Sequence, residues 1–159
     1  MEIILILHNI RSVYNVGSIF RTADAAGVSK IYLSGYTPTP LDRFKRERPD
    51  LAKVALGAEK TIAWEYCKTG IEAISRARKD GFTIVAVEQD KNATPLFSYA
   101  PKNKIALVLG NEVRGLSYAL LAKCDDIVEI PMLGYKESLN VSVAAGIALF
   151  TLTHFFIDA

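Results

Sequence analysis

Short apolar runs alternate along the chain with longer segments in which apolar residues recur at helical spacing. The runs are rich in Ile, Val and Leu and contain few polar residues, which is typical of strands buried on both faces of a parallel sheet. We predict strands at residues 2–7, 30–33, 83–87, 105–109 and 127–130.

The segments between these runs carry signals for the start and end of helices. Asn15 and Ser117 are candidate N-caps, and Gly27 and Gly81 follow the last periodic positions of two segments. We predict helices at residues 16–26, 70–79, 117–123 and 140–157. Strands that alternate with helices indicate an α/β fold with a mostly parallel sheet and helices on both faces.

Two segments depart from this alternation. Residues 36–60 contain Pro38, Pro40 and a charged cluster, which predict a long mobile loop, and long loops in compact domains are often functional. The last helix, from Val141 onward, is apolar nearly all round, so it must be buried on more than one side. A homodimer in which this helix contacts a second subunit is the favoured interpretation, and burial within one chain is the alternative.

Composition narrows the class of protein. The 159 residues suit a single domain, and a hydrophobic content of 50% excludes a disordered chain. Cys67 and Cys124 form no C-x-x-C motif, so we expect neither a metal site nor a disulfide, which fits the reducing cytoplasm. Polar residues interrupt the longest apolar stretch, residues 141–157, so we expect no membrane span.

The formal net charge of +2 is too small by itself to indicate a nucleic-acid partner. Its distribution is more informative, because residues 1–60 hold nine Lys and Arg against six Asp and Glu. Four bases and two acids fall within residues 41–48. This cluster is either an ordinary solvated loop or a surface that contacts phosphates.

Familiar catalytic motifs are absent from the sequence: it contains no G-x-S-x-G, H-E-x-x-H or Walker A pattern. Polar residues gather instead in loops after predicted strands, where open α/β sheets bind their ligands. Asn15, Gly17 and Arg21 stand out after the first strand. Arg21 has apolar sequence neighbours, where an unpaired cation is costly. It is therefore either paired with a carboxylate or directed at a phosphate or reacting group.

Two further polar segments complete a pattern. A G-N-E-V-R-G-L turn runs from Gly110 to Leu116, and I-P-M-L-G followed by S-L-N-V-S-V-A spans Ile130 to Ala144. With N-x-G-x-x-x-R-T-A from residue 15, these motifs resemble the SpoU (TrmH-like) branch of the SPOUT superfamily of RNA methyltransferases over nearly the whole chain. Val113 stands where many members carry glycine.

The resemblance implies a SPOUT-type α/β fold with a C-terminal trefoil knot, a homodimer, and no separate RNA-binding domain within residues 1–159. It also implies that S-adenosylmethionine binds in the knot, where apolar side chains flank the adenine and main-chain groups read its edge. The implied cofactor contacts are Val87, Leu109, Gly110, Ile130, Met132 and Leu139.

The implied reaction is methyl transfer to a ribose 2′-hydroxyl of tRNA or rRNA, with no metal ion. The resemblance makes Arg21 the catalytic residue, supported by Asn15, Glu112, Ser138 and Asn140. Because a guanidinium hardly ever deprotonates, we expect Arg21 to stabilise the developing alkoxide while a substrate phosphate takes the proton. The expected RNA contacts are basic residues, namely Arg11, Arg43, Lys45, Arg46 and Arg48.

Two other functions remain open from the sequence. The first is an RNA- or nucleotide-binding module without catalytic activity, and the second is a methyltransferase for small molecules. A methyltransferase should bind S-adenosylmethionine, whereas a binding module without catalytic activity should not. An RNA methyltransferase should lose RNA affinity and its salt dependence when the bases of residues 41–48 are substituted, whereas a methyltransferase for small molecules should not.

Overall fold

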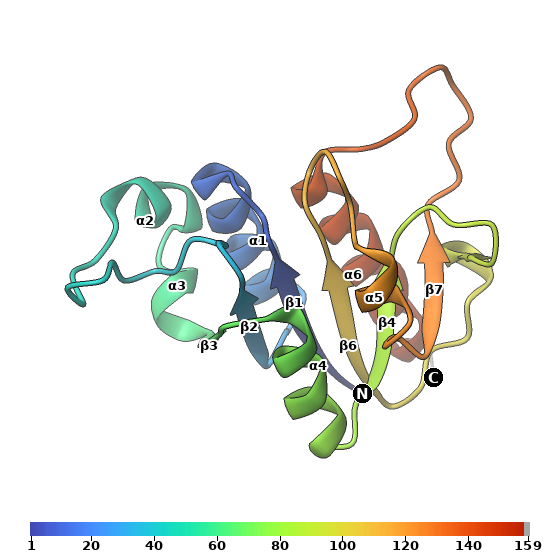
Figure 1. The fold of residues 1–159 in the computed structure, drawn as a ribbon, viewed down its shortest axis with the longest axis horizontal. Helices are drawn as coiled ribbons and strands as arrows, with labels where there is room; N and C mark the ends of the chain where they lie inside the picture. Colours follow the sequence, from blue (N-terminus) through green and yellow to red (C-terminus); the bar gives the residue numbers. More distant parts are fainter. Residues whose placement is uncertain (158–159) are drawn as a thin grey trace.

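One parallel sheet organises the chain (Figure 1). The computed structural model describes the backbone of residues 1–157 and the side-chain surroundings of residues 1–154. The sheet has the order β3-β2-β1-β6-β4-β7-β5, and every pairing in it is parallel. Its strands are β1 (Glu2–His8), β2 (Lys30–Ser34), β3 (Ala63–Cys67), β4 (Thr83–Val87), β5 (Thr94–Pro95), β6 (Lys104–Leu109) and β7 (Asp126–Glu129).

Helices cover both faces of this sheet, which confirms the predicted α/β fold. Alternate residues of β1 enter two separate apolar cores because successive side chains of a strand point to opposite faces. The core on one face packs against α1 (Val13–Ala25), α2 (Pro49–Ala55), α3 (Ala58–Thr61), η1 (Leu96–Ser98) and α6 (Val141–Ile157). The other core packs against α4 (Gly70–Lys79) and α5 (Tyr118–Leu121).

The prediction of a long mobile loop at residues 36–60 is wrong for residues 49–60, whereas residues 36–48 contain no helix or strand. The segment contains α2 and α3, and α2 packs closely on α1, since a Cβ on Gly17 would lie 2.9 Å from the Leu51 carbonyl oxygen. Pro49 occupies the first turn of α2, where proline has no intrahelical hydrogen bond to lose. The proline content therefore marks the start of a helix as well as a loop.

The start of α1 also differs from the prediction. Ser12, not Asn15, is the N-cap, and its hydroxyl accepts a hydrogen bond of 3.1 Å from the Asn15 amide. The buried Asn15 side chain is consequently free of any capping role and points to other partners. A residue that the sequence suggests as a local cap is thus available to join distant segments.

The carboxyl ends of β1, β4, β6 and β7 meet at one edge of the sheet because all strands run in the same direction. The segments that follow them include the three motifs found in the sequence. The loop after β7 rises from this edge and crosses over it to reach α6 (Figure 1). Within residues 1–157, no helix has both the length and the apolar character needed to cross a membrane.

Candidate active site

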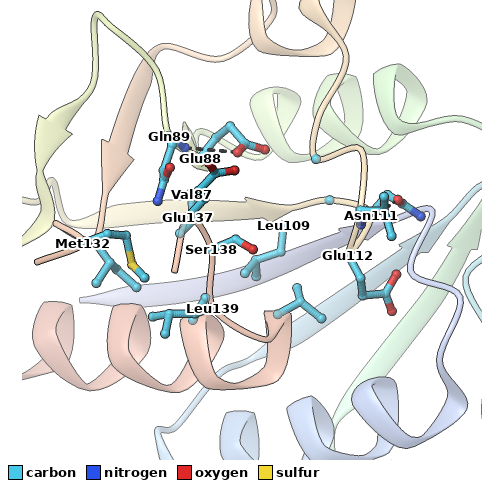
Figure 2. A pocket seen from close by; sticks show the side chains of 16 residues that line it. Val87, Glu88, Gln89, Leu109, Asn111, Glu112, Met132, Glu137, Ser138 and Leu139 are labelled. Atoms are coloured by element: carbon cyan, nitrogen blue, oxygen red, sulfur yellow. Dashed lines mark hydrogen bonds between the residues drawn. The ribbon is translucent and has the colours of Figure 1, made fainter. Parts of the chain in front are cut away.

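A cavity lies at the carboxyl ends of β4, β6 and β7 and is closed on one side by the start of α6 (Figure 2). All six residues predicted as cofactor contacts line it: Val87, Leu109, Gly110, Ile130, Met132 and Leu139. The parallel sheet brings them together, since they follow or end three neighbouring strands. Sequence reasoning did not assign Gln89, Asn111, Glu137, Val141 and Ala144 to the cofactor site, although they also line the cavity.

The lining combines apolar walls with carboxylates. Leu109, Met132 and Leu139 point into the cavity in Figure 2, and carboxylates are contributed by Glu88, Glu112 and Glu137. No Lys or Arg is among the described residues that line it. The cavity therefore offers apolar contact and negative charge, which suits a ligand with a flat apolar ring and a positive centre.

The turn after β6 is fixed against the loop after β4. Glu88 accepts a hydrogen bond of 3.0 Å from the Leu116 amide, and it also bonds the amide of Gln89. Gly115 adopts a positive φ of 64°, and a Cβ there would overlap the Glu88 carboxylate. Glycine at this position thus allows Glu88 to hold the turn that forms the cavity wall.

A hydrogen-bond network joins residues from all three sequence motifs. The Glu112 carboxylate accepts bonds of 3.2 Å from the Arg11 amide, the Ser12 amide and the Asn15 side chain. Asn15 in turn accepts a bond of 3.1 Å from the Asn140 side chain. Three residues that lie far apart in the sequence, Asn15, Glu112 and Asn140, therefore form one chain of contacts.

Asn140 also starts α6. Its side-chain oxygen accepts bonds from the Ser142 amide at 2.8 Å and the Ser142 hydroxyl at 2.6 Å. The same amide group of Asn140 thus caps the helix and holds Asn15, so the position of α6 at the cavity depends on the network.

These contacts alter the acidity of Glu112. Burial alone raises the pKa of its carboxyl group. Hydrogen bonds from its own amide, the Arg11 and Ser12 amides and the Asn15 side chain outweigh that effect, so the pKa lies below its ordinary value. Glu112 is consequently ionised at neutral pH and acts as a fixed acceptor.

The structure places Ser138 at the cavity but not Arg21. The expectation that Arg21 lies in apolar surroundings is wrong, because its side chain is exposed although Ile19 and Phe20 are buried. Each helical residue turns by about 100°, so neighbours in sequence face different directions. Among residues 1–154, no side chain forms a hydrogen bond or ion pair with the Arg21 guanidinium.

The basic loop at residues 41–48 is an ordered turn. Asp42 accepts hydrogen bonds from the Phe44 amide at 2.8 Å and the Arg46 amide at 3.0 Å, and it forms an ion pair with the Arg46 side chain. Hydrogen bonds from the Arg46 and Phe44 amides accordingly hold the pKa of Asp42 below its usual value, although burial opposes them. The turn is therefore shaped by its one central carboxylate.

Some of the basic residues predicted to contact RNA are already paired with a carboxylate, and others are not. Arg46 pairs with Asp42, and Arg48 lies 3.6 Å from Asp50. Arg43 and Lys45 are exposed and have no acidic partner among the described residues. The remaining predicted contact, Arg11, is also exposed, and its backbone amide bonds Glu112.

Other chemistries find little support in the part of the chain that is described. It contains no group of three His, Cys, Asp or Glu side chains placed to hold a metal ion. Cys67 and Cys124 are both free, and burial raises the pKa of each thiol to about 11. Neither thiol is therefore an activated nucleophile at neutral pH.

Comparison with known proteins identifies the family. Residues 2–150 match the family model described as "SpoU rRNA Methylase family". A protein of Ralstonia nicotianae named 23S rRNA (guanosine-2′-O-)-methyltransferase RlmB is 33% identical over 148 residues, which are 93% of this chain and 57% of that protein. The chain thus spans little more than half the length of this curated relative.

Solved structures show the same fold. An AdoMet-bound rRNA methyltransferase from Sinorhizobium meliloti is 28% identical, with a TM-score of 0.85 over 97% of this chain and 56% of that chain. A TrmH/SpoU tRNA modifying enzyme from A. aeolicus is 27% identical, with a TM-score of 0.85 over 99% of this chain and 76% of that chain.

The Glu112 network leads to a prediction for stability. We expect Glu112→Gln to lower the free energy of unfolding at pH 7 by about 1–3 kcal/mol, because an amide nitrogen then faces a hydrogen-bond donor. A carboxyl with a lowered pKa stabilises the fold above its unfolded pKa, and that contribution is lost as the pH falls through its folded pKa. Urea unfolding of both proteins should therefore show a smaller difference at about pH 3 than at about pH 7.

Glu137→Gln is the matched control, since Glu137 lines the same cavity but is exposed and has no hydrogen-bond partner among the described residues. Its stability should stay close to that of the wild type at both pH values. A difference between Glu112→Gln and the wild type that does not change with pH would contradict the assigned role of the carboxylate.

Proposed function

The chain belongs to the SpoU rRNA methylase family, and we propose that it is an RNA methyltransferase that uses S-adenosylmethionine to methylate a ribose 2′-hydroxyl. The observation that carries this proposal is that two of the sequence motifs line one cavity, while the hydrogen bonds of Asn15 to Glu112 and Asn140 join the third motif to them. The name of the Ralstonia relative supports the 2′-hydroxyl as acceptor, and the bound cofactor of the Sinorhizobium structure supports S-adenosylmethionine.

The cavity fits this cofactor in shape and charge. Apolar side chains of Leu109, Met132 and Leu139 supply a slot for adenine, and the carboxylates on the lining favour a positively charged ligand. When bound, the cofactor supplies an electrophilic methyl group on a sulfonium. The residues of the chain bind and orient it, and the start of α6 keeps water from one side of the cavity.

We assign catalytic support to the network of motif residues. Glu112, which lines the cavity, and Asn140 both hold Asn15 by hydrogen bonds, and Ser138 lies on the cavity lining. Arg21 faces solvent, so its guanidinium is available to the ribose and phosphates of an RNA substrate approaching from outside. There it stabilises the developing negative charge on the 2′-oxygen, and a substrate phosphate accepts the proton.

The proposed RNA surface includes the basic loop. Arg43 and Lys45 are the cations of this loop that carry uncompensated charge, so they are the residues that a phosphate would contact. Arg46 and Arg48 shape the loop through their ion pairs. Arg11 lies next to the Glu112 network and extends the positive surface toward the cavity.

We propose that the chain forms a homodimer through the outer side of α6. One side of α6 is buried in the core, through Ala145, Ala148, Leu149 and Leu152. The other side leaves Phe150 52% exposed, beside Phe97, which is 60% exposed. Large apolar residues grouped on a surface are typical of protein interfaces. α6 also packs on α1, the helix that carries Arg21.

We place the trefoil knot of the proposed SPOUT-type fold where the chain crosses from β7 to α6. β7 pairs with β4 on the side away from β6, whereas α6 packs against α1, which follows β1. Residues 130–140 therefore pass over the carboxyl ends of the intervening strands (Figure 1). The cavity lies at the same crossing, which supports a cofactor site formed by the knotted segment.

Calorimetry with S-adenosylmethionine tests the cofactor site. We expect the wild type to bind it at micromolar concentrations and Met132→Ala to bind at least about tenfold more weakly, since burial of a Met side chain contributes ~1.5–3 kcal/mol. Leu133→Ala is the matched control, because Leu133 is 98% exposed and does not line the cavity. Absence of binding to the wild type at high micromolar cofactor would reject the methyltransferase proposal.

Arg21→Lys tests catalysis separately from binding. We expect unchanged affinity for S-adenosylmethionine and unchanged stability, because Arg21 is exposed and lies outside the cavity. The rate of methyl transfer should fall about 100-fold, since a lysine keeps the charge but loses the planar pair of donors. Mass spectrometry of ribose-methylated nucleosides in treated total RNA measures this rate. A Lys variant with full activity would contradict a role that needs the guanidinium.

Sedimentation equilibrium tests the dimer. We expect the wild type to sediment at twice the mass of one chain and Phe150→Glu to sediment as a monomer, because the new charge would be buried at the interface. Ile71→Glu is the control, since Ile71 is an exposed apolar residue of α4 on the opposite face of the sheet. A wild-type monomer, or a dimer that persists in Phe150→Glu, would exclude this interface.

A further inference from the structure

A groove lies beside the cavity on the carboxyl edge of the sheet. It is lined by residues of the segment that follows β2, of the loop at residues 41–48, of the start of α2 and of the edge strand β3. Its lining includes the aromatic residues Tyr36, Trp64 and Tyr66 and the cations Arg43 and Lys45. The lining also holds Arg48 and the three carboxylates of Asp42, Glu47 and Asp50, which pair with Arg46, Lys60 and Arg48 respectively. The groove therefore combines aromatic surface with the uncompensated charges of Arg43 and Lys45, and it is distinct from the cofactor cavity.

Tyr36 connects the groove with the cavity. Its hydroxyl accepts a hydrogen bond of 3.0 Å from the side chain of Asn111, which lines the cavity, and its amide donates to the Asn9 side chain at 3.2 Å. Asn111 also donates to the Asn9 carbonyl at 3.0 Å. The Tyr36 ring is thus held at both its backbone and its hydroxyl end.

The backbone around Tyr36 is equally constrained. Gly35 has a positive φ of 67°, and a Cβ there would overlap the Asn9 side chain. The Gly35 carbonyl accepts a bond of 3.0 Å from the Tyr66 hydroxyl, and the buried Thr37 hydroxyl bonds the Leu7 carbonyl at 3.0 Å. Such a rigid setting loses little conformational entropy when a ligand binds.

This fixed ring is nevertheless open to solvent. Tyr36 is 57% exposed and Tyr66 is 49% exposed. By contrast, the guanidinium groups of Arg43 and Arg46 already lie over the Phe44 ring, at 4.8 Å and 4.9 Å from its centre. No cation stacks on Tyr36 within the described residues, so its ring is available to an outside partner.

We propose that Tyr36 is the stacking residue that receives an unpaired base of the RNA substrate close to the methylated nucleotide. The inference rests on the proposed function. Rigid exposed aromatic rings beside cations are the usual means of binding single-stranded RNA, because every base has a π-face. The phosphates of the same strand then contact Arg43 and Lys45, whose charges are unpaired.

The geometry of the sheet limits which base this is. Only β1 separates β2 from β6, so the ends of these two strands lie about 10 Å apart at ~4.8 Å per strand. Bases in a stacked strand follow each other at ~3.4 Å. The base on Tyr36 is therefore within about three positions of the nucleotide whose ribose reaches the cavity, and Tyr36 contributes to the choice of that nucleotide.

Fluorescence of 2-aminopurine tests this inference without cofactor or catalysis. The probe is a single-stranded RNA 12-mer of mixed sequence with 2-aminopurine at its centre. We expect the wild type and Tyr36→Phe to quench the probe on binding, because both keep the ring. Tyr36→Ala should lose the quenching and bind about tenfold more weakly, as for the loss of one base–aromatic stack. Tyr118→Ala, which removes a tyrosine 88% exposed on α5, should behave as the wild type.

The outcomes separate this role from a structural one. If Tyr36→Phe loses affinity as Tyr36→Ala does, the bond to Asn111 and not the ring carries the effect, and stacking is overturned. Tyr36→Ala binding and quenching as the wild type would overturn it too, as would a wild type without affinity for the probe. Circular dichroism verifies the fold of each variant. A wild type that stacks the probe but fails to bind S-adenosylmethionine would reject the proposed function and leave the stacking role intact.

Discussion

The candidate site depends on the hydrogen bonds that the ionised carboxylate of Glu112 accepts. It binds the start of α1 through two amides and Asn15, and Asn15 binds Asn140 at the start of α6. These segments are about 100 residues or more apart in sequence, and the pairing of β1 with β6 places them side by side. The polar network and the fold therefore support each other.

A parallel sheet explains why two functional surfaces lie side by side. All strands end at one edge, so the segments after β4, β6 and β7 form the cavity, and those after β1 and β2 form the wall next to it. Glu112 and Asn111 are adjacent in the turn after β6, and Glu112 lies on the side of the cavity whereas Asn111 contacts the groove. Glu112 holds the residues around the cavity, whereas Asn111 holds Tyr36 at the groove. One short turn thus sets the position of both surfaces.

The sequence predicts most of the buried sheet and less of its edges. The runs that form β1, β4 and β6 are apolar throughout because both of their faces are covered. β3 was missed because it is an edge strand with mostly exposed or half-buried residues, whose sequence AWEYC lacks a continuous apolar run. The prediction omits α2 because Pro38, Pro40 and the charged cluster favour a loop, whereas Pro49, which suits the first turn of a helix, was not considered.

For the site, too, the sequence identifies residues within motifs but not the contacts between distant segments. The resemblance to a family located the residues that line the cavity, but it could not show which way Arg21 points. Tyr36 belongs to no motif, and its hydrogen bonds with Asn111 and Asn9 across β1 connect it with the cavity. The chain surrounds the cofactor cavity with its own segments, while Arg21 and the Tyr36 ring face outward. Within the proposed function, we infer that contacts of the RNA with these outward-facing residues bring the reacting ribose to the cavity.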